Sequence, residues 1–297
     1  MNEIDAQVRE SAVRTALAED CAGDDVTTLW AVPADARAHA RILARQDGVV
    51  AGLPILGEVY RQLGHDVEVS VHVKDGERVQ AGQSLAELTG PSRAIITGER
   101  TALNFLQRMS GIATHAAAFV DAVAGLPVRI LDTRKTAPGL RALDKYAVAT
   151  AGASNHRLNL AAMVLLKENH IAAAGGVGAA VAAVRAHNAA GIAVEVEVES
   201  VAQAAEALRT GVEWIMLDNM SLPDIRQVVA MRAAHGTRIE ASGNVGLDSV
   251  KAIALTGVDA ISVGAITHSA PAFDLTLLLS RIRDRSPRRH VDVVAKE

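Results

Sequence analysis

The residues best suited to chemistry form three short blocks. They are Asp132-Thr133-Arg134-Lys135-Thr136-Ala137-Pro138-Gly139, Asn155-His156-Arg157 and Lys167-Glu168-Asn169-His170. The first and third blocks follow the apolar runs 128–131 and 163–166. Cationic side chains at the ends of buried strands are poor core material and good anion ligands. Because the chain as a whole is acidic, with a formal net charge of -4, these blocks predict recognition of a small, highly negative substrate.

Carboxylates occupy the ends of two further apolar runs. Glu195, Glu197 and Glu199 alternate with valines, so they share one strand face, which is either solvated or turned into a barrel. Asp218 follows the run 214–217. Glu197 and Asp218 together are suited to ordering a ribose diol and a hydrated Mg²⁺, which prefers one or two carboxylates plus phosphate oxygens.

Two late segments are rich in small residues. Ser242-Gly243-Asn244 and Val263-Gly264-Ala265 each follow an apolar run. They are either tight turns or phosphate-binding loops, because small residues leave backbone N–H groups accessible and a following helix adds a positive dipole. As a pair at the ends of late strands, they favour phosphate binding.

The elements that position these groups alternate between strand and helix. Short apolar runs predict parallel strands at 128–131, 163–166, 194–198, 214–217, 238–241 and 260–263, with helices such as 177–188 and 201–210 between them. No Gly-x-Gly-x-x-Gly turn opens a first unit, so the rhythm indicates a β/α barrel rather than a dinucleotide-binding sheet. In such a barrel the polar groups above meet at the carboxyl ends of the strands.

The first third of the chain has a different pattern. A helix is predicted around residues 4–17, strands at 38–43 and 67–73, and a long helix at 98–124. Residues 74–85 are similar to lipoyl and biotinyl carrier sandwiches, but no lysine stands at the hairpin tip. The closing segment 275–283 is predicted to be an amphipathic helix.

Composition excludes several classes of protein. Aromatic residues make up only 2% of the 297 residues, which argues against a stacking platform for single-stranded nucleic acid, and the acidic balance argues against general nucleic-acid binding. The single cysteine, Cys21, excludes an internal disulfide and favours a cytoplasmic protein. The amino terminus lacks the order of a secretory signal, and no apolar run reaches the ~18 residues of a membrane span.

The motifs in this order resemble the quinolinate phosphoribosyltransferases, the carboxylating nicotinate-nucleotide pyrophosphorylases. The resemblance includes the three cationic blocks and the segments 23–28, 98–104 and 110–114. It implies an α/β fold with an N-terminal α/β sandwich at 1–110, with which a C-terminal helix at 273–297 can pack. An incomplete, about seven-stranded α/β barrel of the type II phosphoribosyltransferase kind follows at 111–272. It also implies a homodimer in which Arg100 reaches the partner's site.

The implied reaction joins quinolinate to 5-phosphoribosyl-1-pyrophosphate, giving nicotinate mononucleotide, pyrophosphate and CO₂, with Mg²⁺ and no organic cofactor. The two quinolinate carboxylates need converging cations, for which the candidates are Arg100, Arg134, His156, Arg157 and Lys167, with Thr133 beside them. Lys135 and Lys167 are assigned to the pyrophosphate, Glu197 and Asp218 to the ribose and Mg²⁺, and the amides of 242–244 and 263–265 to the 5′-phosphate. Catalysis is thus assigned to Lys135, Lys167, Glu197 and Asp218.

Three other functions remain as alternatives. A relative of the same fold with another acceptor, such as a nicotinate-specific enzyme or a homologue linked to molybdenum transport, would need fewer cations. A phosphosugar isomerase or aldolase would use Lys167 as a Schiff-base former or a glutamate as base. A lipoyl-like carrier would carry a modified lysine.

Overall fold

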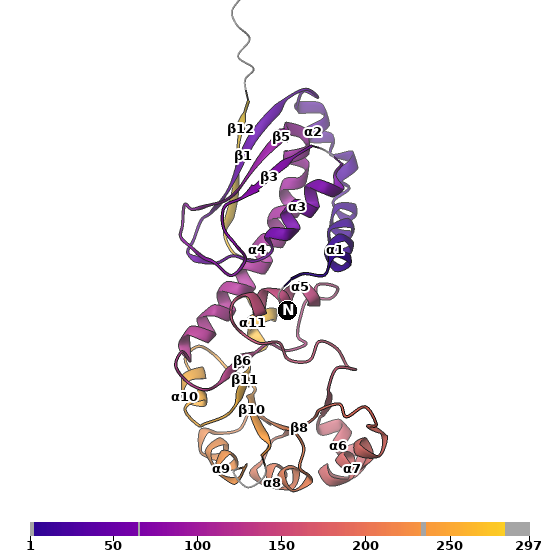
Figure 1. The fold of residues 1–297 in the computed structure, drawn as a ribbon, viewed down its shortest axis with the longest axis vertical. Coiled ribbons are helices and arrows are strands. Elements are labelled where there is room, and N and C mark those ends of the chain that lie inside the picture. Colours follow the sequence, from indigo (N-terminus) through magenta and orange to yellow (C-terminus); the bar gives the residue numbers. More distant parts are fainter. Residues whose placement is uncertain (1–2, 65, 233–235, 283–297) are drawn as a thin grey trace, which may run out of the picture.

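The structure is a computed structural model that describes residues 3–64, 66–232 and 236–282. Figure 1 shows two parts, an upper one built mainly from the first third of the chain and a lower one built from the rest. The long helix α4 (Ser92–Ala122) passes from one part into the other. The predicted boundary between residues 110 and 111 lies inside this helix.

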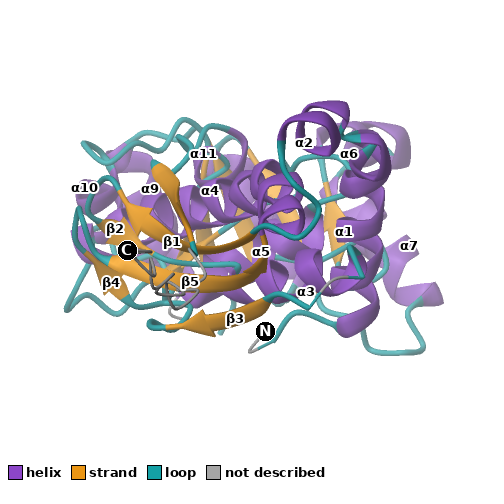
Figure 2. Ribbon diagram, turned by 90° about the horizontal axis from the view of Figure 1, so that it is seen from above, coloured by secondary structure: helices purple, strands orange, loops and turns teal. Residues whose placement is uncertain are grey.

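The upper part is a two-layer α/β sandwich, which confirms the predicted fold of this region. Its antiparallel sheet has the strand order β12-β1-β5-β3 and packs on α4 (Figure 2). The strands are β1 (Arg37–Ala44), β3 (Glu68–Val71), β5 (Ser84–Pro91) and β12 (Leu275–Arg281), with a separate ribbon of β2 (Gly48–Val49) and β4 (Arg78–Val79). The helices are α1 (Ala6–Glu19), a 3₁₀ turn at Ala22–Asp24, α2 (Val26–Ala31) and α3 (Leu53–Gln62).

The prediction of a closing helix at 275–283 is wrong. Residues 275–281 form strand β12, which pairs antiparallel with β1 from Ala38 to Ala44. The leucines favour a helix locally, but pairing satisfies the backbone of an otherwise open sheet edge, and Leu275 and Leu277 become buried. The rest of the predicted helix, residues 283–297, lies outside the described residues.

The lower part is an incomplete parallel barrel. Its strand order is β6-β11-β10-β9-β8-β7, formed by β6 (Arg129–Leu131), β7 (Val164–Leu166), β8 (Val194–Val198), β9 (Trp214–Asp218), β10 (Arg238–Ser242) and β11 (Ala260–Ser262). A parallel bridge between Leu131 and Ser154 adds one more short segment beside β6. The sheet and this bridge account for the predicted count of about seven strands.

Helices cover the outside of this barrel, as expected for strands that are buried on both faces (Figure 1). They are α6 (Glu168–Ala174), α7 (Val177–His187), α8 (Val201–Thr210), α9 (Leu222–Arg232) and α10 (Val250–Ala254). Two further helices, α5 (Arg141–Thr150) and α11 (Ala265–His268), contact α4 near the junction of the two parts. Each predicted strand of the lower part is present within two residues of its expected bounds.

The parallel arrangement gives the barrel two different ends. At the amino end, the guanidinium groups of Arg129 and Arg238 both lie over the ring of Trp214. Their Cζ atoms are 5.4 and 5.3 Å from the ring centroid. These cation–π contacts stabilise the fold at the end away from the predicted site. The predicted chemical groups lie at the carboxyl end. Among the described residues, no helix is both long and apolar enough to cross a membrane.

Candidate active site

The loop after β6 carries the first cationic block. Arg134 is half-buried, and its Nε is a buried donor with no hydrogen-bond partner among the described residues. Lys135 is exposed, its carbonyl accepts a hydrogen bond from Thr267 Oγ1 (2.9 Å), and its side chain lies against Gly264. Thr133 Oγ1 accepts from the Lys135 amide at 3.0 Å. The loop is therefore fixed beside the end of β11, with a guanidinium donor left available.

Arg157 brings a second guanidinium to the same place. Its Nη1 donates to the carbonyl of Met163 (3.0 Å), which holds the side chain across the start of β7. Burial and the nearby Arg134 both lower the pKa of Arg157, because each disfavours its positive charge. Two guanidinium groups that repel one another in a partly buried site are stabilised by an anion between them.

The carboxylates predicted to face the ribose end neighbouring strands. Glu197 on β8 and Asp218 on β9 are both half-buried, and Lys167 forms an ion pair with Glu197. Glu199 lies beyond the end of β8 and is exposed. A small hollow of about 160 Å³ opens here, lined by Glu168, Ile171, Ala172, Glu197, Glu199 and Gln203. The structure thus brings cation and carboxylate groups together at one end of the barrel.

The two loops of small residues also lie at this end. Gly243 has φ 93°, and a Cβ there would meet the Asn219 side chain at 2.3 Å, so only glycine fits. Asn244 Nδ2 donates to Asn219 Oδ1 (3.0 Å), which links the loops after β9 and β10. The Val263 amide donates to the Leu131 carbonyl (2.9 Å) and therefore belongs to the sheet rather than to a phosphate site.

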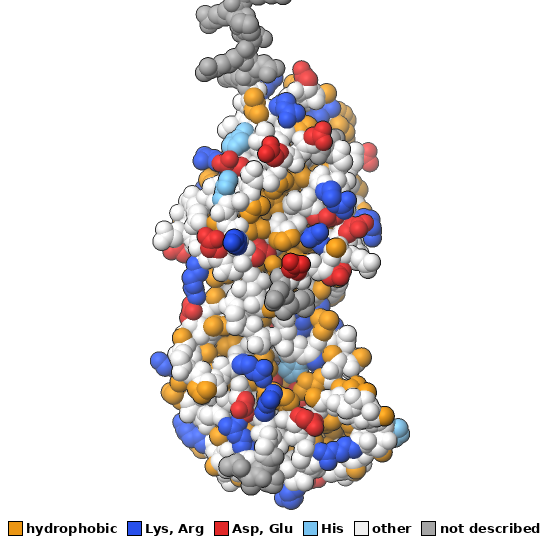
Figure 3. Space-filling model, viewed as in Figure 1, with side chains coloured by type: hydrophobic (Ala, Val, Ile, Leu, Met, Phe, Trp, Pro, Cys, Tyr) orange, Lys and Arg blue, Asp and Glu red, His pale blue; other side chains and the backbone are white. Residues whose placement is uncertain are grey.

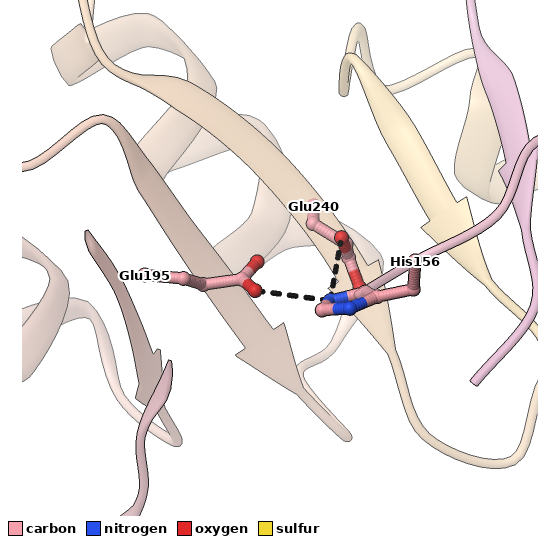
Figure 4. A group of neighbouring side chains, drawn as sticks. All are labelled: His156, Glu195 and Glu240. Carbon is pink, nitrogen blue, oxygen red and sulfur yellow. Dashed lines mark hydrogen bonds and ion pairs between the residues drawn. The ribbon is translucent and has the colours of Figure 1, made fainter. Parts of the chain in front are cut away.

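A buried cluster lies beneath these groups. His156 Nε2 is 3.0 Å from Glu195 Oε2 and 3.7 Å from Glu240 Oε2. Figure 4 shows the two carboxyl groups, from β8 and β10, converging on the imidazole. Glu195 and Glu240 are 0% and 1% exposed. Burial raises the pKa of Glu195 to about 7, and burial with the neighbouring Glu195 raises that of Glu240 to about 8. At neutral pH Glu240 is therefore mainly protonated, and Glu195 is close to the midpoint of its titration.

The protonation of His156 decides what this cluster can bind. The Arg157 amide donates to His156 Nδ1 (2.7 Å), so the ring proton must be on Nε2, from which it is donated to Glu195. Burial also lowers the pKa of His156. The imidazole is thus neutral and offers no lone pair to a metal at Nε2. It differs from the cation that the sequence predicted, and both of its nitrogens are used within the chain.

The pH dependence of stability tests this cluster. The pKa of Glu240 is raised in the fold, so its contribution to stability is complete below its unfolded pKa and is lost as pH rises through about 8. Replacing Glu240 with glutamine removes this loss. We expect the free energy of unfolding of the variant, relative to the parent, to increase between pH 5 and pH 9 by on the order of 1–3 kcal/mol.

Denaturant titrations at several pH values measure this difference. Glu10→Gln, which changes an exposed carboxylate, is the matched control and should give a curve parallel to that of the parent. A parallel curve for Glu240→Gln as well would contradict the assigned protonation.

Two buried charges near the site were missed from the sequence. Asp144 and Lys145 are adjacent on α5 and 0% exposed. Nothing in the local pattern of α5 distinguishes them from surface charges, because only the loops packed over the helix bury them. Asp132, which was expected at the rim, is also 0% exposed and pairs with Lys145.

Arg100 lies on α4, and this helix also borders a second cavity, larger than the hollow beside Glu197. Arg100 is exposed on α4. A cavity of about 950 Å³ is bounded by α1, by α4 from Thr101 to Arg108 and by residues 138–142. On the face drawn in Figure 3, basic and acidic side chains are interspersed over the surface of the lower part.

Comparisons with known proteins find matches to both parts of the chain. Two family models match, described as quinolinate phosphoribosyl transferase, N-terminal domain, at residues 25–110, and C-terminal domain, at residues 112–278. A nicotinate-nucleotide pyrophosphorylase [carboxylating] of Mycobacterium leprae is 42% identical and covers 93% of this chain and 99% of its own. Quinolinate phosphoribosyltransferase [decarboxylating] 1b of Nicotiana tabacum is 41% identical over 90% of this chain and 81% of its own.

A solved structure shows the same architecture. NadC from Streptococcus pyogenes superimposes with a TM-score of 0.91 and 38% identity, covering 95% of this chain and 100% of its own. The similarity therefore extends through both parts of the fold. The chain belongs to the quinolinate phosphoribosyltransferase family.

Proposed function

We propose that this chain transfers the phosphoribosyl group of 5-phosphoribosyl-1-pyrophosphate to quinolinate, with loss of CO₂, in NAD biosynthesis. The observation that carries this function is the proximity of Arg134 and Arg157, together with a buried Arg134 Nε that has no hydrogen-bond partner among the described residues. Two adjacent carboxylates on a small ring match two guanidinium groups at a partly buried site. Lys135 and Lys167 add the charge needed for the pyrophosphate.

The proposed reaction assigns a role to each of these groups. The quinolinate ring nitrogen attacks C1′ of the ribose as the bond from C1′ to pyrophosphate breaks. Positive charge develops on the ribose carbon, and Glu197 and Asp218 are placed to stabilise it. When the C2 carboxylate departs as CO₂, its bonding electron pair stays on C2, where the positive charge of the quaternary ring nitrogen stabilises it until C2 takes up a proton from solvent.

Binding of the remaining parts uses the two late loops and the buried cluster. The amides of Ser242–Asn244, Gly264 and Ala265 are assigned to the 5′-phosphate. His156 acts by accepting a hydrogen bond from the Arg157 amide, which fixes the backbone from which the Arg157 side chain extends. Thr133 supports the Lys135 backbone.

We further propose magnesium as the metal. Glu197 and Asp218 fit it, because they are half-buried oxygen donors at the ends of neighbouring strands. When bound with substrate, the ion offsets charge on the leaving pyrophosphate. A cytoplasmic location is the matching proposal for a chain with a single cysteine, Cys21.

The assay that tests the function is release of labelled CO₂ from quinolinate carrying the label in its C2 carboxylate. Release should require both 5-phosphoribosyl-1-pyrophosphate and Mg²⁺, and nicotinate should be a poor substitute as acceptor. Faster turnover of nicotinate, or no release under any of these conditions, would reject the proposed reaction.

We also propose a homodimer in which Arg100 serves the partner's site. Its exposed position on α4, away from the other cations, supports this arrangement. Mixing inactive Arg100→Ala with inactive Lys135→Ala subunits should then restore about a quarter of the parent activity, because mixed dimers hold one intact site.

The control is a mixture of Arg134→Ala with Lys135→Ala. Both changes fall in the barrel of one subunit, so each site of a mixed dimer keeps one defect and no activity should return. Subunit exchange is verified first with differently tagged chains. Failure of the Arg100 mixture to recover any activity, once exchange is shown, would exclude a shared site.

A further inference from the structure

Helix α5 carries two adjacent charges that are fully buried between the substrate loops. Asp144 and Lys145 are each 0% exposed. Taking a charge out of water is costly unless it is paired and hydrogen-bonded, and both of these are. Neighbours on a helix point in different directions, so the two side chains contact different loops.

Lys145 fixes the segment that carries Arg157. Its Nζ donates to Asp132 Oδ1 (2.5 Å) and to the His156 carbonyl (2.9 Å). Asp132 Oδ1 also accepts from the His156 amide (2.8 Å), and Asp132 Oδ2 accepts from Asn155 Nδ2 (2.8 Å). These bonds hold residues 154–156 beside the end of β6, immediately before the guanidinium assigned to quinolinate.

Asp144 fixes the other loop. It accepts two hydrogen bonds from Arg108, at 2.9 Å from Nε and 2.7 Å from Nη2, so the pair is bidentate. Asp144 Oδ2 also accepts from the Ala137 amide (3.0 Å). The loop is thereby fastened two residues after Lys135, which is assigned to the pyrophosphate.

We propose that Lys145 and Asp144 are positioning residues that separately place the two halves of the site. Lys145 places the quinolinate half through Asp132 and residues 154–157. Asp144 places the pyrophosphate half through the backbone of residues 135–137. Neither acts on substrate directly. The inference rests on the proposed function for the naming of the two halves, but the mechanical separation of the loops stands on the contacts alone.

Kinetics of two shape-matched variants test the separation. Lys145→Met should raise the KM for quinolinate roughly tenfold to a hundredfold, since small displacements of binding groups are expensive. Its KM for 5-phosphoribosyl-1-pyrophosphate should stay within about twofold of the parent. In Asp144→Asn, the KM for 5-phosphoribosyl-1-pyrophosphate should rise and the KM for quinolinate should stay near that of the parent. A merely structural role would move both constants together, because both residues lie on one helix.

Hydrogen exchange provides a readout that needs no turnover. Lys145→Met should speed amide exchange in a peptide spanning 153–158 and leave 133–139 near the parent rate, and Asp144→Asn should do the reverse. Leu88→Ala, at a 0% exposed position in the upper sheet, controls for general destabilisation. This variant should lower the melting temperature, but its effects on the exchange rates of the two peptides should be similar, and so should its effects on the two KM values.

Two less disruptive substitutions test the proposal if either of the first variants does not fold. Asn155→Ala removes two bonds from the Lys145 network, those to Asp132 Oδ2 and to the Lys145 carbonyl, and Arg108→Met removes the outer partner of Asp144. They should reproduce the same two patterns at smaller size. Equal changes of both KM values and both peptides, or no change in any, would overturn the proposal. If the proposed function is wrong, the result is different. The parent protein then does not turn over quinolinate, while the two variants still change hydrogen exchange in different peptides.

Discussion

Replacing Arg134 with alanine should raise the KM for quinolinate and lower kcat/KM by roughly 10- to 150-fold. The reason is that Arg134 Nε is a buried donor without a partner among the described residues, and the Arg134 guanidinium is close enough to Arg157 to lower its pKa. A hydrogen bond to a charged group contributes about 1.5–3 kcal/mol, and more where water is excluded. Initial-rate kinetics with quinolinate as the varied substrate measure the effect.

Two further variants define what Arg134 supplies. Arg134→Lys keeps the charge but loses the planar pair of donors, so it should recover only part of the affinity. Arg238→Ala removes the same charge at the opposite end of the barrel, where Arg238 contacts Trp214, and should leave the KM within about twofold. Near-normal kinetics of Arg134→Ala would remove this residue from the site.

Replacing Asp218 with asparagine should lower kcat by roughly 100- to 1000-fold, with a smaller effect on the KM for quinolinate. Asp218 ends β9 beside Glu197, and its negative charge is assigned to the ribose as positive charge develops there. Asparagine has nearly the same shape as aspartate, and its side-chain oxygen can still accept the hydrogen bond from Asn219 Nδ2. The fold should therefore persist. Single-turnover measurements separate this chemical step from product release.

Asp224→Asn is the matched control, since it removes the same charge from the following helix α9. Its kcat should remain close to that of the parent. A kcat of Asp218→Asn that also stays near the parent value, with Mg²⁺ saturating, would show that the carboxylate has no part in the chemical step.

Local patterns were sufficient for most of the fold. The apolar runs of the barrel strands were readable because parallel strands buried on both faces have no polar alternation. The segment 275–281 was misread, since its leucines suit either state and only the open edge of β1 selects a strand. A chain's own sequence does not show which distant strand lacks a neighbour.

The sequence by itself determined the chemistry of the site. Cations and carboxylates placed after successive strands must meet at one end of a parallel barrel, whatever the details of packing. Tertiary structure alone decided which of these groups are paired within the chain. It buried Asp132 against Lys145, and it engaged both nitrogens of His156 within the chain, because burial and proton position depend on neighbours that the folded chain brings together from distant segments.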